Sequence, residues 1–118
     1  MTESQEQQAI MQWAGLAQGK YPELALLHHI PNGGKRDKVT AAILRREGVK
    51  PGVPDLCLPV PRGGYHGLYL ELKAGKNTPT GNQLWWIEKL SEQGYWAGWC
   101  VGADEAIHKI KKYLEEQP

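Results

Sequence analysis

Two short apolar segments that flank a glycine-rich break constrain the fold of this chain more than any other feature. Residues 52–58 and 67–73 are bounded by turn residues and predict two β-strands, and the break between them predicts a chain reversal. If the reversal is centred on Gly63, the strands form an antiparallel hairpin with Asp55 directly opposite Glu71. Facing residues in such a pair have Cβ atoms about 4.5–5.5 Å apart. Two carboxylates held that close repel each other unless a positive charge lies between them.

Side-chain alternation assigns the two faces of the second strand. Successive side chains of a strand point to opposite faces, so Glu71 and Lys73 share one face while Leu70 and Leu72 share the other. One face of the hairpin then carries Asp55, Glu71 and Lys73 together, and the opposite face is apolar. This arrangement predicts a divalent-metal site with a lysine beside it. A plain salt bridge from Lys73 to Glu71 is the alternative interpretation.

Magnesium is the ion expected at such a site, and Mn²⁺ is expected to substitute for it. Mg²⁺ prefers octahedral oxygen coordination and is usually held by one or two carboxylates together with substrate phosphate. A bound ion polarises the scissile phosphate and lowers the pKa of a water molecule so that the water can attack. Lys73 could hold or help to deprotonate that water, and it could offset charge that builds on the phosphorus.

The rest of the chain places this hairpin in an α/β fold. Two capping-box pairs, Thr2 with Gln5 and Thr80 with Gln83, predict the first residues of two helices. The expected elements are a helix at 3–18, a strand at 24–30, a helix at 39–47, the two hairpin strands, a helix at 80–94, a strand at 95–101 and a helix at 104–116. Their order, α-β-α-β-β-α-β-α, predicts a β-sheet flanked by helices.

Length and composition narrow the class of protein. A chain of 118 residues predicts a single domain spanning residues 1–118. No run approaches the ~18 apolar residues that a membrane span needs, so no membrane partner is expected. The polar, acidic first residues do not resemble a signal peptide, and a cytoplasmic location is expected. The two cysteines, Cys57 and Cys100, lie in apolar strand-like runs and are interpreted as buried free thiols.

Basic residues gather in one stretch although the net charge is only +1. Between positions 35 and 50, two acids, Asp37 and Glu47, accompany a set of basic residues: Lys35, Arg36, Lys38, Arg45, Arg46 and Lys50. A patch of this kind could neutralise several phosphates. A solvated helix face explains the pattern equally well. Asn32 and the following two glycines could also meet phosphate, or they could form a plain turn.

A family resemblance sharpens these predictions. The sequence Pro54-Asp55 … Glu71-Leu72-Lys73 resembles the signature of PD-(D/E)XK nucleases. The order HIPNGG at 29–34, GVPDL at 52–56, GGYHGL at 63–68 and then LELK is similar to the virus-type replication–repair nuclease (VRR-NUC) domain, in its stand-alone phage or bacterial form. The resemblance runs from position 3 to about 114. It implies a restriction-endonuclease-like core with a mixed sheet, similar in fold to archaeal-type Holliday junction resolvases.

The resemblance assigns roles to residues of the hairpin. It implies that Asp55 and Glu71 bind the metal and that Lys73 is the catalytic lysine. The backbone carbonyl of Leu72 falls where such sites often have a main-chain metal ligand. Gln83 matches a glutamine that could position water or substrate, or that could simply cap its helix.

The first helix is expected to supply a third acid. Glu3, with Gln7 and Trp13 at the family spacing, is the expected metal ligand, and Glu6 is the rival candidate because it also lies on a helical stripe with Trp13. An acid favoured by the helix dipole is the alternative for both. The neighbouring histidines at 28 and 29 point to opposite faces of a strand and are interpreted as structural.

On the helix after Thr80, the residues Leu84, Ile87 and Leu90 are expected to face the core, which leaves Trp85 exposed. An exposed tryptophan there could be half of a dimer contact.

Together these observations predict a Mg²⁺-dependent, structure-selective endodeoxyribonuclease. The expected substrate is branched DNA such as a Holliday junction, and a homodimer would match its approximate two-fold symmetry. The alternatives are a catalytically silent DNA-binding module of the same fold and a nuclease that acts on flaps or linear DNA. A sequence-specific restriction-type enzyme is disfavoured because the chain is too short for a recognition domain.

Overall fold

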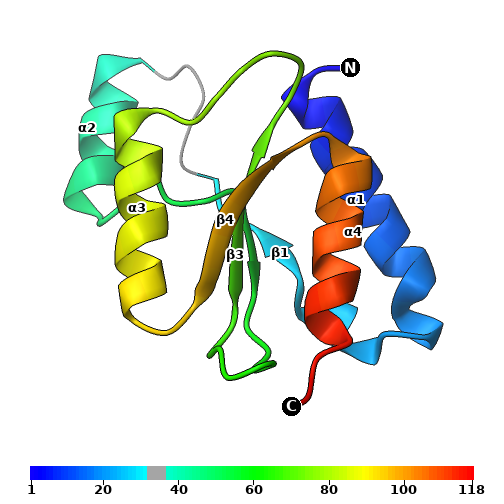
Figure 1. The fold of residues 1–118 in the computed structure, drawn as a ribbon. Helices are drawn as coiled ribbons and strands as arrows, with labels where there is room; N and C mark the ends of the chain where they lie inside the picture. Colours follow the sequence, from blue (N-terminus) through cyan, green and yellow to red (C-terminus); the bar gives the residue numbers. More distant parts are fainter. Residues whose placement is uncertain (32–36) are drawn as a thin grey trace.

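A computed structural model of the chain describes residues 1–31 and 37–118. Three of the residues expected to contact DNA, Asn32, Lys35 and Arg36, lie outside the described residues, as do the two glycines between them. The expected helices and the two hairpin strands can be followed in Figure 1. None of the described helices is long and apolar enough to span a membrane.

A mixed sheet forms the centre of the described fold (Figure 1). Its strands, in spatial order, are β1 (His28–His29), β2 (Leu56–Leu58), β3 (Leu68–Lys73) and β4 (Trp96–Val101). The first two pairings are antiparallel and the β3–β4 pairing is parallel. The predicted hairpin register is confirmed, because Cys57 lies opposite Tyr69. Asp55 falls one residue before β2, just beyond the last paired position.

Helices cover both sides of this sheet. The helices α1 (Glu3–Leu16) and α4 (Ala103–Leu114) pack together on one side, and α2 (Lys38–Arg46) and α3 (Gly81–Glu92) lie on the other (Figure 1). The predicted order of elements and the predicted mixed α/β class are confirmed. Short 3-10 segments, Ala17–Gly19 and Pro22–Leu26, follow α1.

The main core lies between the sheet and the pair α1 and α4. Leu70 and Leu72 are fully buried there, as the alternation of β3 predicts, and they belong to one cluster with Ile10 of α1 and Ile110 of α4. By contrast, α3 has no fully buried residue. The sheet therefore has a tightly packed apolar side and a second side whose cover is looser and more polar.

The strand expected at 24–30 is wrong in most of its length. Residues Pro22–Leu26 form a 3-10 helix, and the strand shrinks to His28–His29. Leu24 and Leu27 are buried while Leu26 is 52% exposed, and a spacing of three residues is the period of a 3-10 helix. Pro22 occupies the first helical position, which its fixed φ favours.

The buried stripe expected on α3 is also partly wrong. Leu84 is 48% exposed, whereas Trp85 is exposed as predicted, at 53%. The segment before β2 explains the difference, because the indole N–H of Trp86 donates to the carbonyl of Pro51 at 3.0 Å. This contact turns Trp86 toward the protein and leaves Leu84 toward solvent.

Glu6 completes the first turn of α4. The residue before that helix is Gly102, which has no side chain to cap it, and the carboxylate of Glu6 accepts the N–H of Ala103 instead. Helix N-terminal N–H groups need such acceptors, and a negative charge there is also favoured by the helix dipole. Glu6 therefore connects α1 to α4.

We expect Glu6→Ala to lower the free energy of unfolding by about 1–2 kcal/mol, the usual loss for a helix-capping acceptor. Urea unfolding followed by circular dichroism would measure it. Glu3→Ala is the matched control, because Glu3 borders a cavity at the start of α1 and its loss should change stability far less. Equal destabilisation by the two variants would contradict this assignment.

Candidate active site

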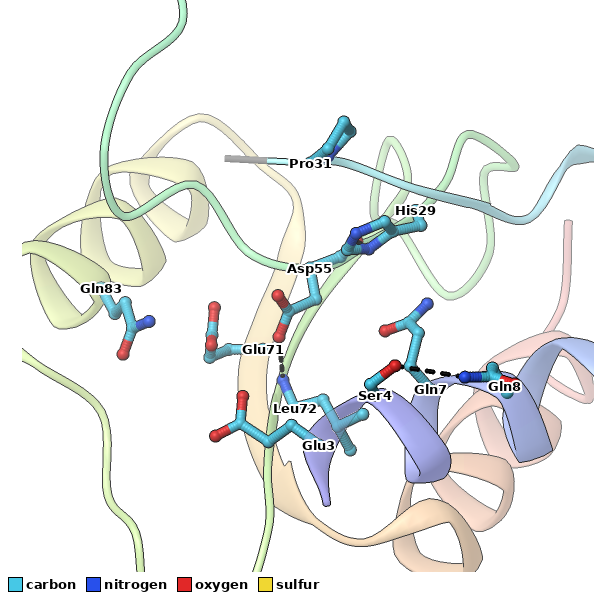
Figure 2. A pocket seen from close by; sticks show the side chains of 10 residues that line it. All are labelled: Glu3, Ser4, Gln7, Gln8, His29, Pro31, Asp55, Glu71, Leu72 and Gln83. Carbon is cyan, nitrogen blue, oxygen red and sulfur yellow. Dashed lines mark hydrogen bonds between the residues drawn. The ribbon is translucent and has the colours of Figure 1, made fainter. Parts of the chain in front are cut away.

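A cavity of about 520 Å³ opens where β3 ends and where α1 and α3 begin (Figure 2). The residues that line it are Glu3, Ser4, Gln7, Gln8, His29, Pro31, Asp55, Glu71, Leu72 and Gln83. They come from α1 and α3, and from β1, β2 and β3 or the residues next to these strands. The cavity thus brings Asp55, Glu71 and Leu72 of the predicted hairpin site together with Glu3 and Gln83.

Asp55 is held in this cavity by the backbone of β3. Its Oδ2 accepts the N–H of Leu72 at 2.8 Å (Figure 2). Because β2 begins only at Leu56, Leu72 has no strand residue opposite it, and the Asp55 side chain takes the place of that partner. The hydrogen bond fixes the orientation of the carboxylate beside Glu71.

Glu71 is a buried carboxylate with one oxygen left unsatisfied. The residue is 1% exposed, and its Oε2 lies 3.5 Å from Nζ of Lys73. Its Oε1 is buried and has no hydrogen-bond partner among the described residues. Burial away from water raises the pKa of Glu71 to about 8, helped by repulsion from Asp55 and by hydrogen bonding of the protonated form to Asp55, while Lys73 partly offsets these effects. An orphaned buried oxygen is costly, so this one fits a site that is completed by a cation.

Lys73 lies on the same face of β3 as Glu71, as side-chain alternation predicts. It is 7% exposed and pairs with Glu71. The pair satisfies the structural alternative, a salt bridge. Lys73 itself does not line the cavity, and it reaches the site through Glu71, which does. Both interpretations of the lysine therefore agree with its position.

The carbonyl of Leu72 points toward the same edge as Asp55. The N–H and C=O groups of one strand residue point to the same neighbour. The Lys73 carbonyl accepts the N–H of Gly102 on the β4 side, so the groups of Leu72 face the other side, where Asp55 receives the N–H. The Leu72 carbonyl is thereby directed at the position where a metal beside Asp55 and Glu71 would lie.

The first-helix acids are separated by the fold. Glu3 lines the cavity, whereas Glu6 contacts the start of α4. Within the described chain, however, no group of three or more His, Cys, Asp or Glu side chains is set closely enough to hold a metal ion. Glu3 is thus near the two hairpin acids without forming a three-acid cluster with them. Trp13 packs against the core.

The other predicted residues take different positions. Gln83 lines the cavity. Its Oε1 also accepts the N–H of Thr80 at 2.8 Å, so it caps α3, which is the alternative role expected from the sequence. Arg45 and Arg46 are exposed in the last turn of α2 and do not line the cavity. They are available to a ligand outside it.

His29 lines the cavity although its sequence context did not predict a functional role. Its Nδ1 lies 3.0 Å from the carbonyl of Asp55. A carbonyl can only accept, so Nδ1 carries the proton in this contact and Nε2 is left to meet other groups. Ser4, Gln7 and Gln8 were likewise not predicted to line a site, and the Nε2 of Gln7 is a second buried polar atom without a partner among the described residues.

Comparison with known proteins identifies the family. The family model for the VRR-NUC domain matches residues 1–104. The chain belongs to the VRR-NUC family. A solved structure described as a VRR_NUC domain protein is similar over 99% of this chain and 91% of its own, with a TM-score of 0.85 and 35% sequence identity. No curated protein matches the chain. A VRR-NUC domain is a nuclease-type domain, and the resemblance drawn from the hairpin sequence is confirmed.

The residues of this VRR-NUC cavity fit a hard divalent cation. Carboxylate and carbonyl oxygens are the ligands that Mg²⁺ and Mn²⁺ accept, and one or two carboxylates suffice for Mg²⁺ when water and phosphate supply the rest. Two acids, Asp55 and Glu71, meet that requirement without a third. The observation that supports the fit is the Oε1 of Glu71, which has no hydrogen-bond partner in the part of the chain that the structure describes.

Metal-free stability should depend on pH through Glu71. Its pKa is about 8 in the fold and near 4.5 when unfolded, so the folded chain binds more protons between these values. Stability is then highest below pH 4.5 for this group and falls as pH rises toward 8, by at most about 1.4 kcal/mol per pH unit for one proton. Glu71→Gln mimics the protonated side chain and should remove this decline.

Urea unfolding in EDTA at about pH 5, 6.5 and 8, a range that runs from just above the unfolded pKa of this group to its folded pKa, tests the prediction. The variant should gain stability relative to the wild type as pH rises. A constant difference between the two proteins across this range would show that Glu71 is charged in the metal-free fold.

Proposed function

We propose that this protein is a Mg²⁺-dependent, structure-selective endodeoxyribonuclease that hydrolyses phosphodiester bonds in branched DNA such as Holliday junctions. The single observation that carries the proposal is the buried Glu71 carboxylate. It lines an open cavity beside an oriented Asp55, it pairs with Lys73, and one of its oxygens has no partner among the described residues. Membership of a nuclease family makes DNA the natural substrate.

The metal would be held by Asp55, Glu71 and the carbonyl of Leu72. When bound, it would supply positive charge beside the scissile phosphate and acidify a nearby water. Glu3 would act at longer range, through a water molecule, because it does not form a cluster with the two hairpin acids. Mn²⁺ would substitute, since it accepts the same oxygen ligands.

Lys73 is the residue proposed to act on the attacking water. Its ammonium is already held 3.5 Å from Oε2 of Glu71, on the face of β3 that carries this acid. Filling the site with a cation would weaken the attraction between Lys73 and Glu71, because both positive groups compete for the same carboxylate. The lysine could then turn to the water or to the phosphate oxygens. Gln83 and His29 border the same space and would position water or substrate.

DNA outside the cavity would be gripped by Arg45 and Arg46, together with Asn32, Lys35 and Arg36. Phosphate contacts of this kind position a duplex without selecting its sequence. The N-terminal ends of α1 and α3 at the cavity would also favour a phosphate.

A homodimer would present two such sites to a four-way junction. The exposed apolar side chains on α2 and α3 are candidates for its interface: Val39, Ile43, Leu84 and Trp85. Exposed apolar residues of this size on one side of a protein are typical of protein contacts.

The rival functions predict different outcomes in one experiment. Purified protein is incubated with labelled junction, flap, splayed and linear DNAs in Mg²⁺, Mn²⁺ or EDTA. The proposal predicts cleavage that requires the metal and favours the junction. Binding without cleavage in every metal would support the silent DNA-binding module, and preference for flaps or linear DNA would replace the junction as substrate.

Lys73→Ala should retain metal and DNA binding but lose cleavage by about 10²–10⁴-fold, the usual cost of removing a proton-transfer or charge-stabilising group. Single-turnover cleavage at saturating DNA would measure the loss. Lys76→Ala, which removes an exposed lysine three residues farther along the chain, is the matched control. Cleavage by Lys73→Ala at the wild-type rate would make the lysine purely structural.

Replacing Arg45 and Arg46 together with Ala should weaken junction binding for every sequence tested. The slope of log K against log salt should fall by about 1.8, because each phosphate of duplex DNA that an arginine neutralises adds about 0.9 to it. Titrations of a labelled junction at several salt concentrations in EDTA would measure both quantities. If affinity and slope are unaltered, the two arginines are a solvated helix face and the DNA lies elsewhere.

A further inference from the structure

A second cavity of about 490 Å³ lies at the other end of the sheet, between the β2–β3 turn and the last turns of α4. Aromatic and basic side chains dominate its lining: Tyr65, Trp96, His108, Lys109, Lys112 and Tyr113. The turn is attached to the C-terminal segment, because the N–H of Gly63 donates to the carbonyl of Gln117 at 2.7 Å. Both segments meet at the bottom of Figure 1, away from the N-terminus of α1.

This cavity is separate from the candidate active site. Trp96 pairs with Leu68 in the parallel ladder, so its side chain lies on the same face as the buried leucines of β3. Glu71 is on the opposite face, and it lies about 10 Å farther along β3 than Leu68 at the rise of an extended strand. A ligand in the second cavity would therefore not fill the space around the two acids.

The aromatic side chains of this cavity have packing partners and still keep exposed surface. The hydroxyl of Tyr113, a buried residue, donates to the carbonyl of Val60 at 2.6 Å. Tyr65 packs against Tyr113 with ring centroids 6.4 Å apart, yet Tyr65 is 42% exposed. Trp96 is packed against the core along one part of its surface and remains partly exposed. Flat apolar surfaces that are fixed and open to solvent can accept a stacked ring.

One lysine lies over the ring of Trp96, and a second lysine lines the same cavity. The Nζ of Lys109 is 6.0 Å from the ring centroid of Trp96, and Lys112 follows one helical turn later on the same side of α4. Neither lysine forms an ion pair among the described residues. Glu116 is the acid that borders the cavity, and the two lysines outweigh its charge. Rings with adjacent cations match a ligand that has both a flat face and a negative charge.

We propose that this cavity binds one nucleotide of an unpaired DNA strand. Its base stacks on the exposed ring of Tyr65, next to Trp96, and its phosphate lies between Lys109 and Lys112. Aromatic side chains interleaved with cations are how proteins bind single strands without sequence preference. A duplex cannot use the rings, because its bases are already stacked on each other. The proposal rests on the proposed function, in which the unpaired strand belongs to an arm of branched DNA.

Binding of a labelled thymidine strand of about ten nucleotides in EDTA, followed by fluorescence anisotropy, tests the site without any cleavage. Lys109→Ala with Lys112→Ala should reduce the salt slope by about 1.4, because each neutralised phosphate of a single strand adds about 0.7 to it. Tyr65→Ala should weaken binding about tenfold, the effect expected of removing one base–aromatic stack. Tyr65→Phe, which keeps the ring, and Lys111→Ala, which removes a charge from the same helix outside the cavity, should bind like the wild type.

A blunt duplex of the same length should bind all these variants alike. If folded Tyr65→Ala and the double lysine variant bind the single strand as tightly as wild type, with the same salt slope, the proposal is overturned. The same holds if Lys111→Ala is as damaging as the double variant, because general charge would then explain the effect. Should Tyr65→Ala unfold, the lysine variants decide alone. A protein that shows the predicted binding pattern but cleaves no DNA would defeat the nuclease proposal and leave this site standing.

Discussion

The burial of Glu71 next to Asp55 is the constraint on which the rest of this structure depends. A carboxylate that is 1% exposed, beside a second acid, has lost most of its hydration and also meets like charge. Lys73 contacts only one of its two oxygens. A buried carboxylate of this kind is stable only where the surrounding structure holds it in place. Here Leu70 and Leu72 are fixed in the core on one face of β3, so the side chain of Glu71 must point to the opposite face.

The candidate site forms because β3 extends beyond the end of β2 at the position of the buried Glu71. Because β3 continues past the end of its pairing with β2, one backbone N–H and one carbonyl face an edge with no strand opposite. Asp55 accepts that N–H, and the carbonyl of Leu72 stays directed at the same edge. Two helices also begin at the cavity, and their N-terminal dipoles favour negative charge there. The fold thus brings two carboxyl groups together and stabilises their charged forms only in part, so that Glu71 has a raised pKa and a divalent cation would favour its charged form.

Features with local causes are predictable from the sequence, and features set by packing are not. Capping boxes and the hairpin register depend on neighbouring residues, and both Thr80 and Cys57 have the partners that the sequence indicates. The apolar run around Leu24 predicts a strand wrongly, because a run without a clear period suits several structures. The stripe that includes Leu84 is wrong because the contact of Trp86 with Pro51, which decides the rotation of α3, involves a segment far away in sequence.

In the candidate site, too, the features with local causes can be predicted from the sequence and those set by packing cannot. Side-chain alternation brings Glu71 and Lys73 to one face, and the family resemblance favours Glu3 over Glu6. The capping of α4 by Glu6 could not be predicted from the sequence, because the N–H that Glu6 accepts belongs to a residue 97 positions later in the chain. The position of His29 is unpredictable for a related reason: its contact with the Asp55 backbone exists only because the two-residue strand β1 pairs beside β2.

Calorimetric titration of Mn²⁺ into the metal-free protein tests the central claim most directly. The wild type should bind the ion, and Asp55→Asn and Glu71→Gln should each lose most of that binding while remaining folded by circular dichroism. Glu6→Gln, which changes an acid outside the cavity, should titrate like the wild type. Unchanged Mn²⁺ binding in both hairpin variants would contradict the account, because the buried carboxylates would then serve some purpose other than holding a metal.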